Sequence, residues 1–179
     1  MKNDAINLRE QAQTKFPTNV PNPEQIRVLD LDRNQLSDIP PEIGSFSHLE
    51  VLSLYHNQLE RLPDEVWGLQ QLKILNISAN RLTAISPRIG ALTHLQMLDL
   101  GHNSISLLPD SMGNLSQLRF LYLSNNQLAD LPNSMGGLEN LIYLNVSDNQ
   151  LEALPDWIGQ LSGLLELRLY NNSIGVVPD

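Results

Sequence analysis

The stretch LRFLYLSNNQLADLPNSMGGLEN, residues 118–140, decides the fold of this chain. Counted from Leu118 as position 1, leucine or another apolar residue occupies positions 1, 4, 6, 11, 14, 18 and 21, with asparagine at position 9, proline at 15 and glycine at 19. The pattern recurs at intervals of 23 residues without insertion or deletion, and its position-1 residues are Ile26, Leu49, Leu72, Leu95, Leu118, Leu141 and Leu164. A period of this length is typical of a solenoid, in which each coil packs against its neighbours.

Each repeat contains a strand and a return segment. Apolar residues at positions 4 and 6 alternate with other residues, which is the period of a strand that buries one face. The long connections between successive strands allow only parallel pairing, so the repeats predict a parallel sheet of about seven strands. In the return half, proline favours the start of a short helical turn. The glycines after it predict left-handed caps at Gly44, Gly90, Gly113, Gly136 and Gly159.

Asparagine occupies position 9 in every repeat. Its amide both donates and accepts hydrogen bonds, so stacked copies can satisfy the backbone groups where the chain leaves the strand. We therefore assign a structural role to the row Asn34, Asn57, Asn80, Asn103, Asn126, Asn149 and Asn172.

The chain before Ile26 shows a different pattern. Ala5, Leu8, Ala12 and Phe16 are spaced by three and four residues, which predicts a short amphipathic helix over residues 4–16. Such a helix could cover the open apolar edge of the first coil. The expected organisation is a helical cap and connector over residues 1–25 and one repeat domain over residues 26–179, with the last repeat incomplete.

Composition narrows the class of partner. A net charge of −9 and a pI near 4.7 oppose binding to nucleic acid or to an anionic membrane surface. The first residues, MKNDAINLREQAQTKF, do not resemble a signal peptide, and no apolar run is long enough to span a bilayer. The chain has no cysteine, which excludes thiol catalysis and disulfides and favours a reducing compartment. We expect a cytoplasmic protein, or one delivered into a host cell, without a cofactor.

The repeat LxxLxLxxNxLxxLPxxIGxLxxL resembles the 23-residue leucine-rich repeats of intracellular proteins, including plant intracellular Ras-group proteins and bacterial repeat proteins and effectors. The resemblance covers residues 26–179. It implies a right-handed α/β horseshoe with the parallel sheet on the concave side and short helical turns on the convex side. It also implies recognition of another protein by the concave face, and it carries over no catalytic residue.

Positions 3, 5, 7 and 8 point away from the core and form the outer face of the predicted sheet. All the tyrosines of the chain fall on this face. Tyrosine and arginine are enriched at the energetic centres of protein interfaces, although aromatic residues also favour strands for their packing alone. We expect partner binding at an aromatic patch made of Met97, Phe120, Tyr122, Tyr143, Asn145, Arg168 and Tyr170. A second, more polar patch is made of Asp30, Asp32, Arg33, Tyr55 and His56.

Two arrangements resemble enzyme sites and are weaker hypotheses. Asp32, His56 and Ser78 lie on neighbouring strands in the order of a hydrolase triad, but the sheet uses the N–H groups that an oxyanion hole would need. His56 and His102 are two repeats apart, too far to share a zinc ion. The sequence therefore predicts neither catalysis nor a metal site.

The sequence favours a protein-binding module over its alternatives. A second interpretation is a structural, self-associating fragment of a larger repeat protein. The final repeat places Leu167, Leu169, Ile174 and Val177 where no further coil covers them, so we expect either a monomer or a weak end-to-end dimer through this edge.

Overall fold

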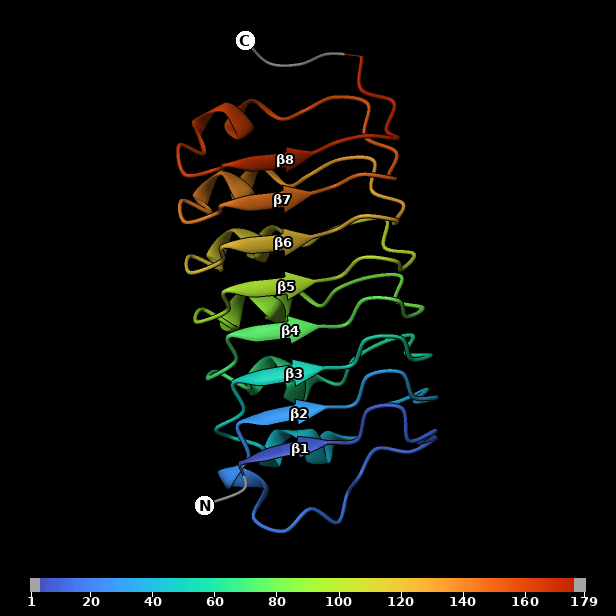
Figure 1. Cartoon of the computed structure of the whole chain (residues 1–179). Helices are drawn as coiled ribbons and strands as arrows, with labels where there is room; N and C mark the ends of the chain where they lie inside the picture. Colours follow the sequence, from blue (N-terminus) through green and yellow to red (C-terminus); the bar gives the residue numbers. More distant parts are fainter. Residues whose placement is uncertain (1–3, 176–179) are drawn as a thin grey trace.

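The computed structural model describes residues 4–175, which build one open sheet of eight parallel strands in chain order. Figure 1 shows the strands stacked as the steps of a single solenoid, with the first and last strands at opposite ends of the stack. The strands are β1 (Ala5–Asn7), β2 (Val28–Asp30), β3 (Val51–Ser53), β4 (Ile74–Asn76), β5 (Met97–Asp99), β6 (Phe120–Tyr122), β7 (Tyr143–Asn145) and β8 (Glu166–Arg168).

Short 3-10 helices lie behind the sheet, on the side of the return segments (Figure 1). They are η1 (Pro23–Gln25), η2 (Pro41–Ser45), η3 (Asp64–Gly68), η4 (Pro87–Ala91), η5 (Asp110–Asn114), η6 (Asn133–Gly137) and η7 (Asp156–Gln160). The short helical turns expected from the proline positions are therefore confirmed. The horseshoe solenoid with a parallel concave sheet is confirmed as well.

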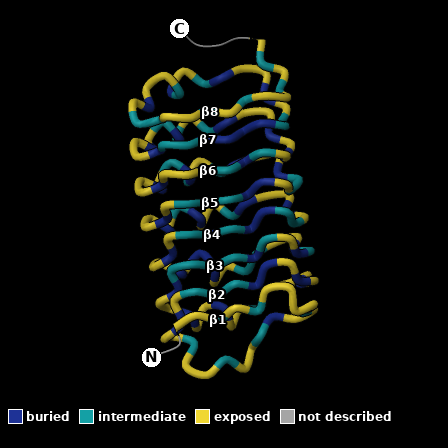
Figure 2. Tube along the Cα trace, in the orientation of Figure 1, coloured by how far each residue is buried: buried dark blue, intermediate teal, exposed yellow. Residues whose placement is uncertain are grey.

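The core lies between the sheet and these helices. Apolar residues of the repeat pattern are buried along the whole stack, as for Leu121 and Leu123 of one coil and Leu144 and Val146 of the next. Figure 2 shows the buried segments recurring at the same place in successive coils. Because every coil contributes the same layer of side chains, the register between neighbouring strands never slips: Leu98 pairs with Leu121, and Leu121 with Leu144.

The helix predicted over residues 4–16 is wrong. Residues 5–7 form β1, which pairs with β2 in the same register as every later pair, Ile6 opposite Leu29. The backbone N–H of Leu8 donates to the carbonyl of Asp30 at 2.8 Å. The segment therefore provides hydrogen-bond partners for the backbone at the edge of the sheet and also covers the apolar side of the first repeat. This strand makes the sheet one strand wider than predicted. Phe16 packs edge-on against Phe46, with ring centroids 6.0 Å apart.

The left-handed glycine caps are also wrong, because no glycine of the described chain has a positive φ. The left-handed residue is instead position 8, just after the strand, where φ lies between 52° and 57° in Arg33, His56, Ala79, His102, Asn125, Asp148 and Asn171. The glycines serve close packing between 3-10 helices. A β carbon on Gly90 would lie 2.8 Å from the Cβ of Ser111 in the next coil, closer than real contacts allow.

Candidate functional site

The position-9 asparagines hold successive coils together. In a representative coil, Asn103 accepts a hydrogen bond at Oδ1 from the Leu82 amide at 3.0 Å. Its Nδ2 donates to the carbonyls of Ile77 and Leu100 at 3.1 and 3.0 Å. One side chain thus satisfies backbone groups of two coils, and the structural role predicted for this row is confirmed.

Position 5 has a structural role that the sequence pattern did not predict. Asparagine or aspartate there accepts a hydrogen bond from the backbone N–H two residues later, a local motif that fixes the chain as it leaves the strand. Five coils form this bond, at 2.9 to 3.0 Å, through Asn7, Asp30, Asn76, Asp99 and Asn145. Asn145, assigned to the aromatic patch, is only 8% exposed, and its amide oxygen bonds Ser147. Its role is therefore to hold the backbone beneath the patch, and it contributes little exposed surface for a partner.

The aromatic residues of the patch lie together on the outer face of β6 and β7. Phe120 pairs with Tyr143 in the sheet, and Tyr122 follows Phe120 by two residues on the same face. The Tyr122 and Tyr143 rings are 4.9 Å apart at an interplanar angle of 39°. Phe120 is 36% exposed and Met97, its partner on β5, is partly exposed. The structure therefore brings these four side chains together.

Charged side chains hold the rim of this cluster. The guanidinium of Arg168 lies 5.6 Å from the centre of the Tyr143 ring, and its Nε donates to Glu166 at 2.6 Å. Arg119 lies over Phe120 at 5.9 Å. Such contacts orient both partners without removing them from water. Tyr170 is 57% exposed and stands at the end of the patch beyond Arg168.

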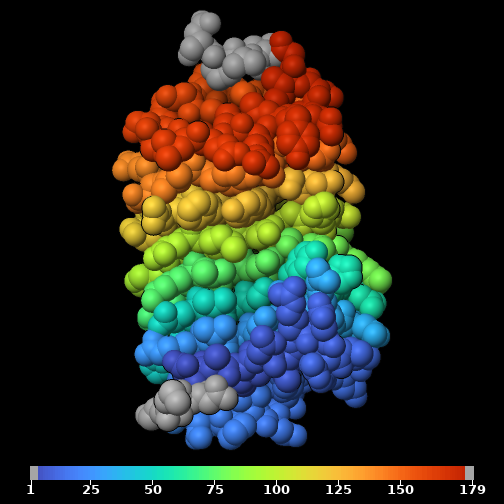
Figure 3. All heavy atoms as spheres, in the orientation of Figure 1, coloured from blue at the N-terminus to red at the C-terminus, as the bar shows by residue number. Residues whose placement is uncertain are grey.

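An apolar extension of the patch was not predicted, because it lies on position 2, the residue before each strand. In the first coils this row forms the ion pairs of Glu50 with Arg27 and with Lys73. In the last coils it becomes apolar: Ile142 is half-buried and Leu165 is 84% exposed. The change from charged to apolar residues along one row is visible in the sequence. Figure 3 shows the last coil, at the C-terminal end of the solenoid, in red.

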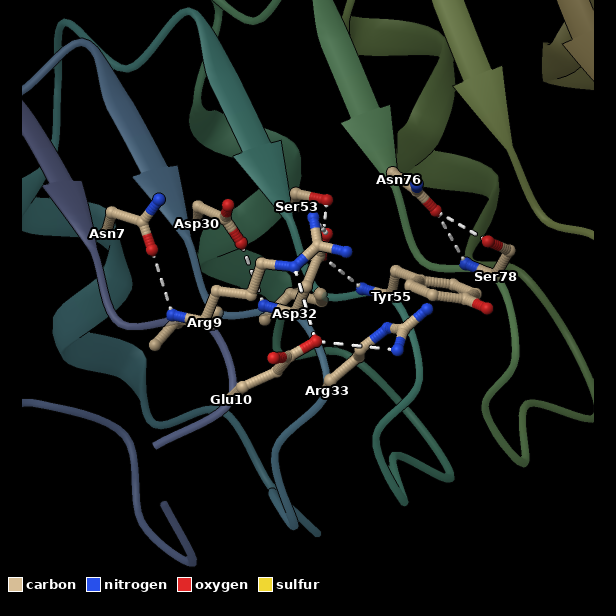
Figure 4. A network of polar contacts seen from close by, with 12 residues as sticks. Asn7, Arg9, Glu10, Asp30, Asp32, Arg33, Ser53, Tyr55, Asn76 and Ser78 are labelled. Carbon is tan, nitrogen blue, oxygen red and sulfur yellow. Dashed lines mark hydrogen bonds and ion pairs between the residues drawn. The ribbon is translucent and has the colours of Figure 1, made fainter. Parts of the chain in front are cut away.

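The second predicted patch is a network of polar contacts at the other end of the sheet (Figure 4). Asp32 accepts hydrogen bonds at Oδ1 from the Ser53 hydroxyl at 2.5 Å and the Tyr55 amide at 2.9 Å. Its other oxygen lies 3.6 Å from a nitrogen of Arg9, and Arg33 lies 3.4 Å from Glu10. The sequence pattern did not indicate Arg9 and Glu10 because it placed them on a helix. They follow β1 and reach over the network in Figure 4.

The rings of this second patch are also in contact. Arg33 lies 5.8 Å from the centre of the Tyr55 ring, and the Tyr55 and His56 rings are 5.7 Å apart. Asp30 accepts the Asp32 amide at 2.9 Å. Most of the polar groups of this patch are therefore already bonded within the protein, whereas the aromatic patch presents apolar surface.

Asp32 and Ser78, two residues of the arrangement that resembles a hydrolase triad, make hydrogen bonds to other residues. The carboxylate of Asp32 binds Ser53 and the Tyr55 amide, while the hydroxyl of Ser78 donates to Asn76 at 2.7 Å. Within residues 4–175, no group of three or more histidine, cysteine, aspartate or glutamate side chains is arranged to hold a metal ion. The described helices are also too short and too polar for any of them to cross a bilayer.

Both tryptophans lie on the convex side and pack within the core. Trp67 in η3 is 4% exposed and Trp157 in η7 is 6% exposed. Both side chains therefore belong to the core of the solenoid and not to its outer surface.

Comparison with known families gives matches along nearly the whole chain. A family model described as leucine rich repeat matches residues 24–82 and 70–128, and one described as leucine-rich repeat region matches residues 108–179. No match was found among curated proteins.

Solved structures with the same architecture come from bacteria and plants. A leucine-rich repeat protein of Leptospira interrogans shares 34% identity with a TM-score of 0.78, covering 97% of this chain and 50% of that one. An internalin from Listeria monocytogenes shares 29% identity with a TM-score of 0.85, covering 94% and 48%. The ectodomain of the Arabidopsis thaliana receptor kinase GASSHO1/SCHENGEN3, solved in complex with CASPARIAN STRIP INTEGRITY FACTOR 2, shares 38% identity with a TM-score of 0.77, covering 83% and 19%. The chain thus spans half or less of each of these structures.

Proposed function

Because the chain belongs to the leucine-rich repeat family, we propose that it binds another protein through the aromatic patch on the concave face of its sheet. The observation that carries this proposal is the cluster of Phe120, Tyr122 and Tyr143, three neighbouring aromatic side chains on the outer face of two paired strands. An exposed apolar surface bordered by polar groups is typical of an interaction site.

The sheet supports such a role because it fixes the side chains before a partner arrives. The strands are held by their backbone hydrogen bonds, and the asparagine row joins neighbouring coils. Tyr143 is further held between the Tyr122 ring and the Arg168 guanidinium. Little conformational entropy is then lost on binding, which favours affinity.

The solved neighbours support binding of a protein or peptide as the class of function. The ectodomain of the Arabidopsis receptor kinase was crystallised with CASPARIAN STRIP INTEGRITY FACTOR 2, and the plant peptide hormone receptor RGFR1 was solved in complex with RGF2. We extend to this chain only the idea that a solenoid of this kind recognises a polypeptide. A role as a bacterial effector, or as a protein that regulates an effector, is a narrower form of the same proposal.

The test is a capture experiment followed by calorimetry. Proteins retained by the wild type but not by Tyr122→Ala or Tyr143→Ala are identified by mass spectrometry, and the affinity of each is then measured with purified material. We expect either substitution to weaken binding by about 2 kcal/mol or more. Val28→Ala, at the same repeat position on β2, is the matched control and should bind as the wild type does. If Asp30 or Arg33 charge reversal abolishes binding while both tyrosine variants bind normally, the second patch is the site.

A second candidate function is self-association through the last coil. Leu167, Leu169 and Ile174 are only partly buried there, whereas Leu144, the equivalent of Leu167 one coil earlier, is fully buried. Val177 lies outside the described residues. We propose a weak end-to-end dimer that buries this edge. Light scattering over a dilution series should show a mass that falls toward the monomer, and Leu167→Glu should shift the equilibrium to the monomer at every concentration. A constant monomer mass would rule this out.

A further inference from the structure

Asp99 is a carboxylate in an unusual position beside the aromatic patch. It lies at the end of β5, directly opposite Tyr122 in the sheet and two residues after Met97. The residue is half-buried, and its Oδ1 accepts the Gly101 amide at 2.9 Å. The side chain is therefore fixed against the backbone on the face that we propose for binding.

The local structure does not need the negative charge of Asp99. Its hydrogen bond to the amide two residues later is made equally well by the neutral side chains of Asn7, Asn76 and Asn145. The distance from the backbone nitrogen to the side-chain oxygen is 3.0 Å for each of these asparagines and 2.9 Å for Asp99. Asparagine would therefore fold this coil in the same way and avoid the cost of removing a charge from water.

No cation of the described chain pairs with this carboxylate. Two other acidic groups on the same face do have such partners within 4.0 Å: Asp32 lies near Arg9, and Glu166 lies near Arg168. Burial raises the pKa of Asp99, against the opposing effects of the Gly101 amide, the Ser78 hydroxyl and the charge of His102. A half-buried carboxylate without an ion-pair partner within 4.0 Å is more stable when a cation is brought to it.

The surroundings favour a cationic partner as well. Residues 96–175 contain eight acidic side chains and two basic ones, a difference of −6. The acidic residues are Asp99, Asp110, Asp130, Glu139, Asp148, Glu152, Asp156 and Glu166. Both arginines are already in contact with groups of the protein, Arg168 with Glu166 and Arg119 with the Phe120 ring. This end of the solenoid attracts positively charged segments and repels acidic ones.

We propose that Asp99 and Tyr122 together bind a lysine or arginine side chain of a protein partner, an inference that rests on the proposed binding function of the aromatic patch. The cation pairs with the Asp99 carboxylate, and its methylene stem packs on Tyr122 and Met97. Arg168 on the Tyr143 ring shows that this surface accommodates a guanidinium, here one supplied by the protein itself. The partner segment is thus basic and apolar, with its basic residue beside an apolar one.

A random peptide library tests the cation site directly, because the selection does not depend on which protein is the natural partner. Peptides are selected on the wild-type protein after removal of those that also bind Tyr122→Ala. We expect the retained peptides to share a lysine or arginine next to an aliphatic or aromatic residue. One such peptide, and a version with its basic residue replaced by glutamine, is then titrated into wild type and Asp99→Asn by calorimetry. Asp99→Asn should bind the basic peptide about tenfold more weakly, and the two proteins should bind the glutamine version equally.

The matched control is Asp30→Asn, which removes one charge at the same repeat position on β2 and keeps the same local hydrogen-bond acceptor. It should change the affinity less than about twofold, because a general loss of negative charge acts weakly at physiological salt. Retained peptides without a basic residue, or equal affinity of wild type and Asp99→Asn, would overturn the cation site while leaving the binding face intact. If no peptide depends on Tyr122, the proposed function itself fails.

Discussion

Gly113 and Ser134 approach each other so closely that a β carbon on Gly113 would lie 2.2 Å from the carbonyl oxygen of Ser134. The two residues belong to η5 and η6, which stack on the convex side of consecutive coils. No described glycine has a positive φ, so the requirement for glycine comes from this packing and not from the backbone conformation.

Gly113→Ala should therefore destabilise the fold by about 1 to 3 kcal/mol, because the added methyl group forces two coils apart. Gly159→Ala is the matched control: it makes the same change at the same repeat position, where nothing lies within 4 Å of the new carbon. The control should stay within about 0.5 kcal/mol of wild type. Urea denaturation followed by circular dichroism measures both variants, and equal stability of the two would contradict the packing argument.

Removing one asparagine of the position-9 row should have a similarly large effect. Asn103→Ala leaves the Leu82 amide and the carbonyls of Ile77 and Leu100 without their partner. We expect a loss of roughly 1 to 3 kcal/mol, seen as a lower melting temperature. Gln127→Ala, which truncates an exposed amide side chain, serves as the control. A melting temperature unchanged by Asn103→Ala would show that water replaces these bonds.

The repeats made most of the fold predictable, because a fixed period of 23 residues determines which side chain faces the core in every coil. The coil that precedes Ile26 was not predicted, because its sequence matches the repeat pattern only in part. Gln11 stands where the later coils have asparagine, and Gln13 where they have an apolar residue. Leu8 and Phe16 fit a helical spacing as well as the repeat, so periodicity alone could not separate the two. The sequence does contain evidence for this coil, in four residues that stand 23 positions before the matching residues of the next repeat: Ile6, Leu8, Phe16 and Pro17.

For the candidate site, the sequence predicted only which repeat positions lie on the outer face of the sheet. Strand alternation placed Phe120, Tyr122 and Tyr143 on one face, and the structure brings them together. Alternation does not say which polar side chains are bonded to the local backbone, as Asn145 is, because that depends on chain geometry after the strand. It also does not locate the exposed Leu165, which precedes its strand and lies outside the alternating segment.

Tyr143→Ala should cost far less stability than Leu144→Ala, its neighbour in β7. Leu144 is completely buried, and its truncation should cost about 2 to 5 kcal/mol. Tyr143 faces outward and loses its contacts with Tyr122 and Arg168, worth about 1 kcal/mol. Chemical denaturation of the two variants gives the comparison. Similar losses would mean that Tyr143 is part of the core and that its effect on binding cannot be separated from folding.

Asp99→Asn should make the protein at least as stable as wild type near neutral pH. Burial holds the pKa of Asp99 above its ordinary value of 3.8, so the folded state binds this proton more tightly than the unfolded chain. The carboxylate therefore reduces stability once the pH has risen through the folded pKa, and this penalty is absent below the unfolded pKa. The groups facing it, His102 on the same coil, Tyr122 on β6 and Ser78 on the preceding coil, are unchanged in the variant.

The measurement is the melting temperature of wild type and Asp99→Asn across the acidic range. The advantage of the variant should be present at pH 7 and shrink as the pH falls through the titration of Asp99, since protonated aspartate and asparagine are both neutral. Asp30→Asn corrects for the change in net charge, because it removes one negative charge on β2. If Asp99→Asn is less stable than Asp30→Asn at pH 7, the charge of Asp99 has a stabilising partner within the protein, and the carboxylate is not free to receive a cation from elsewhere.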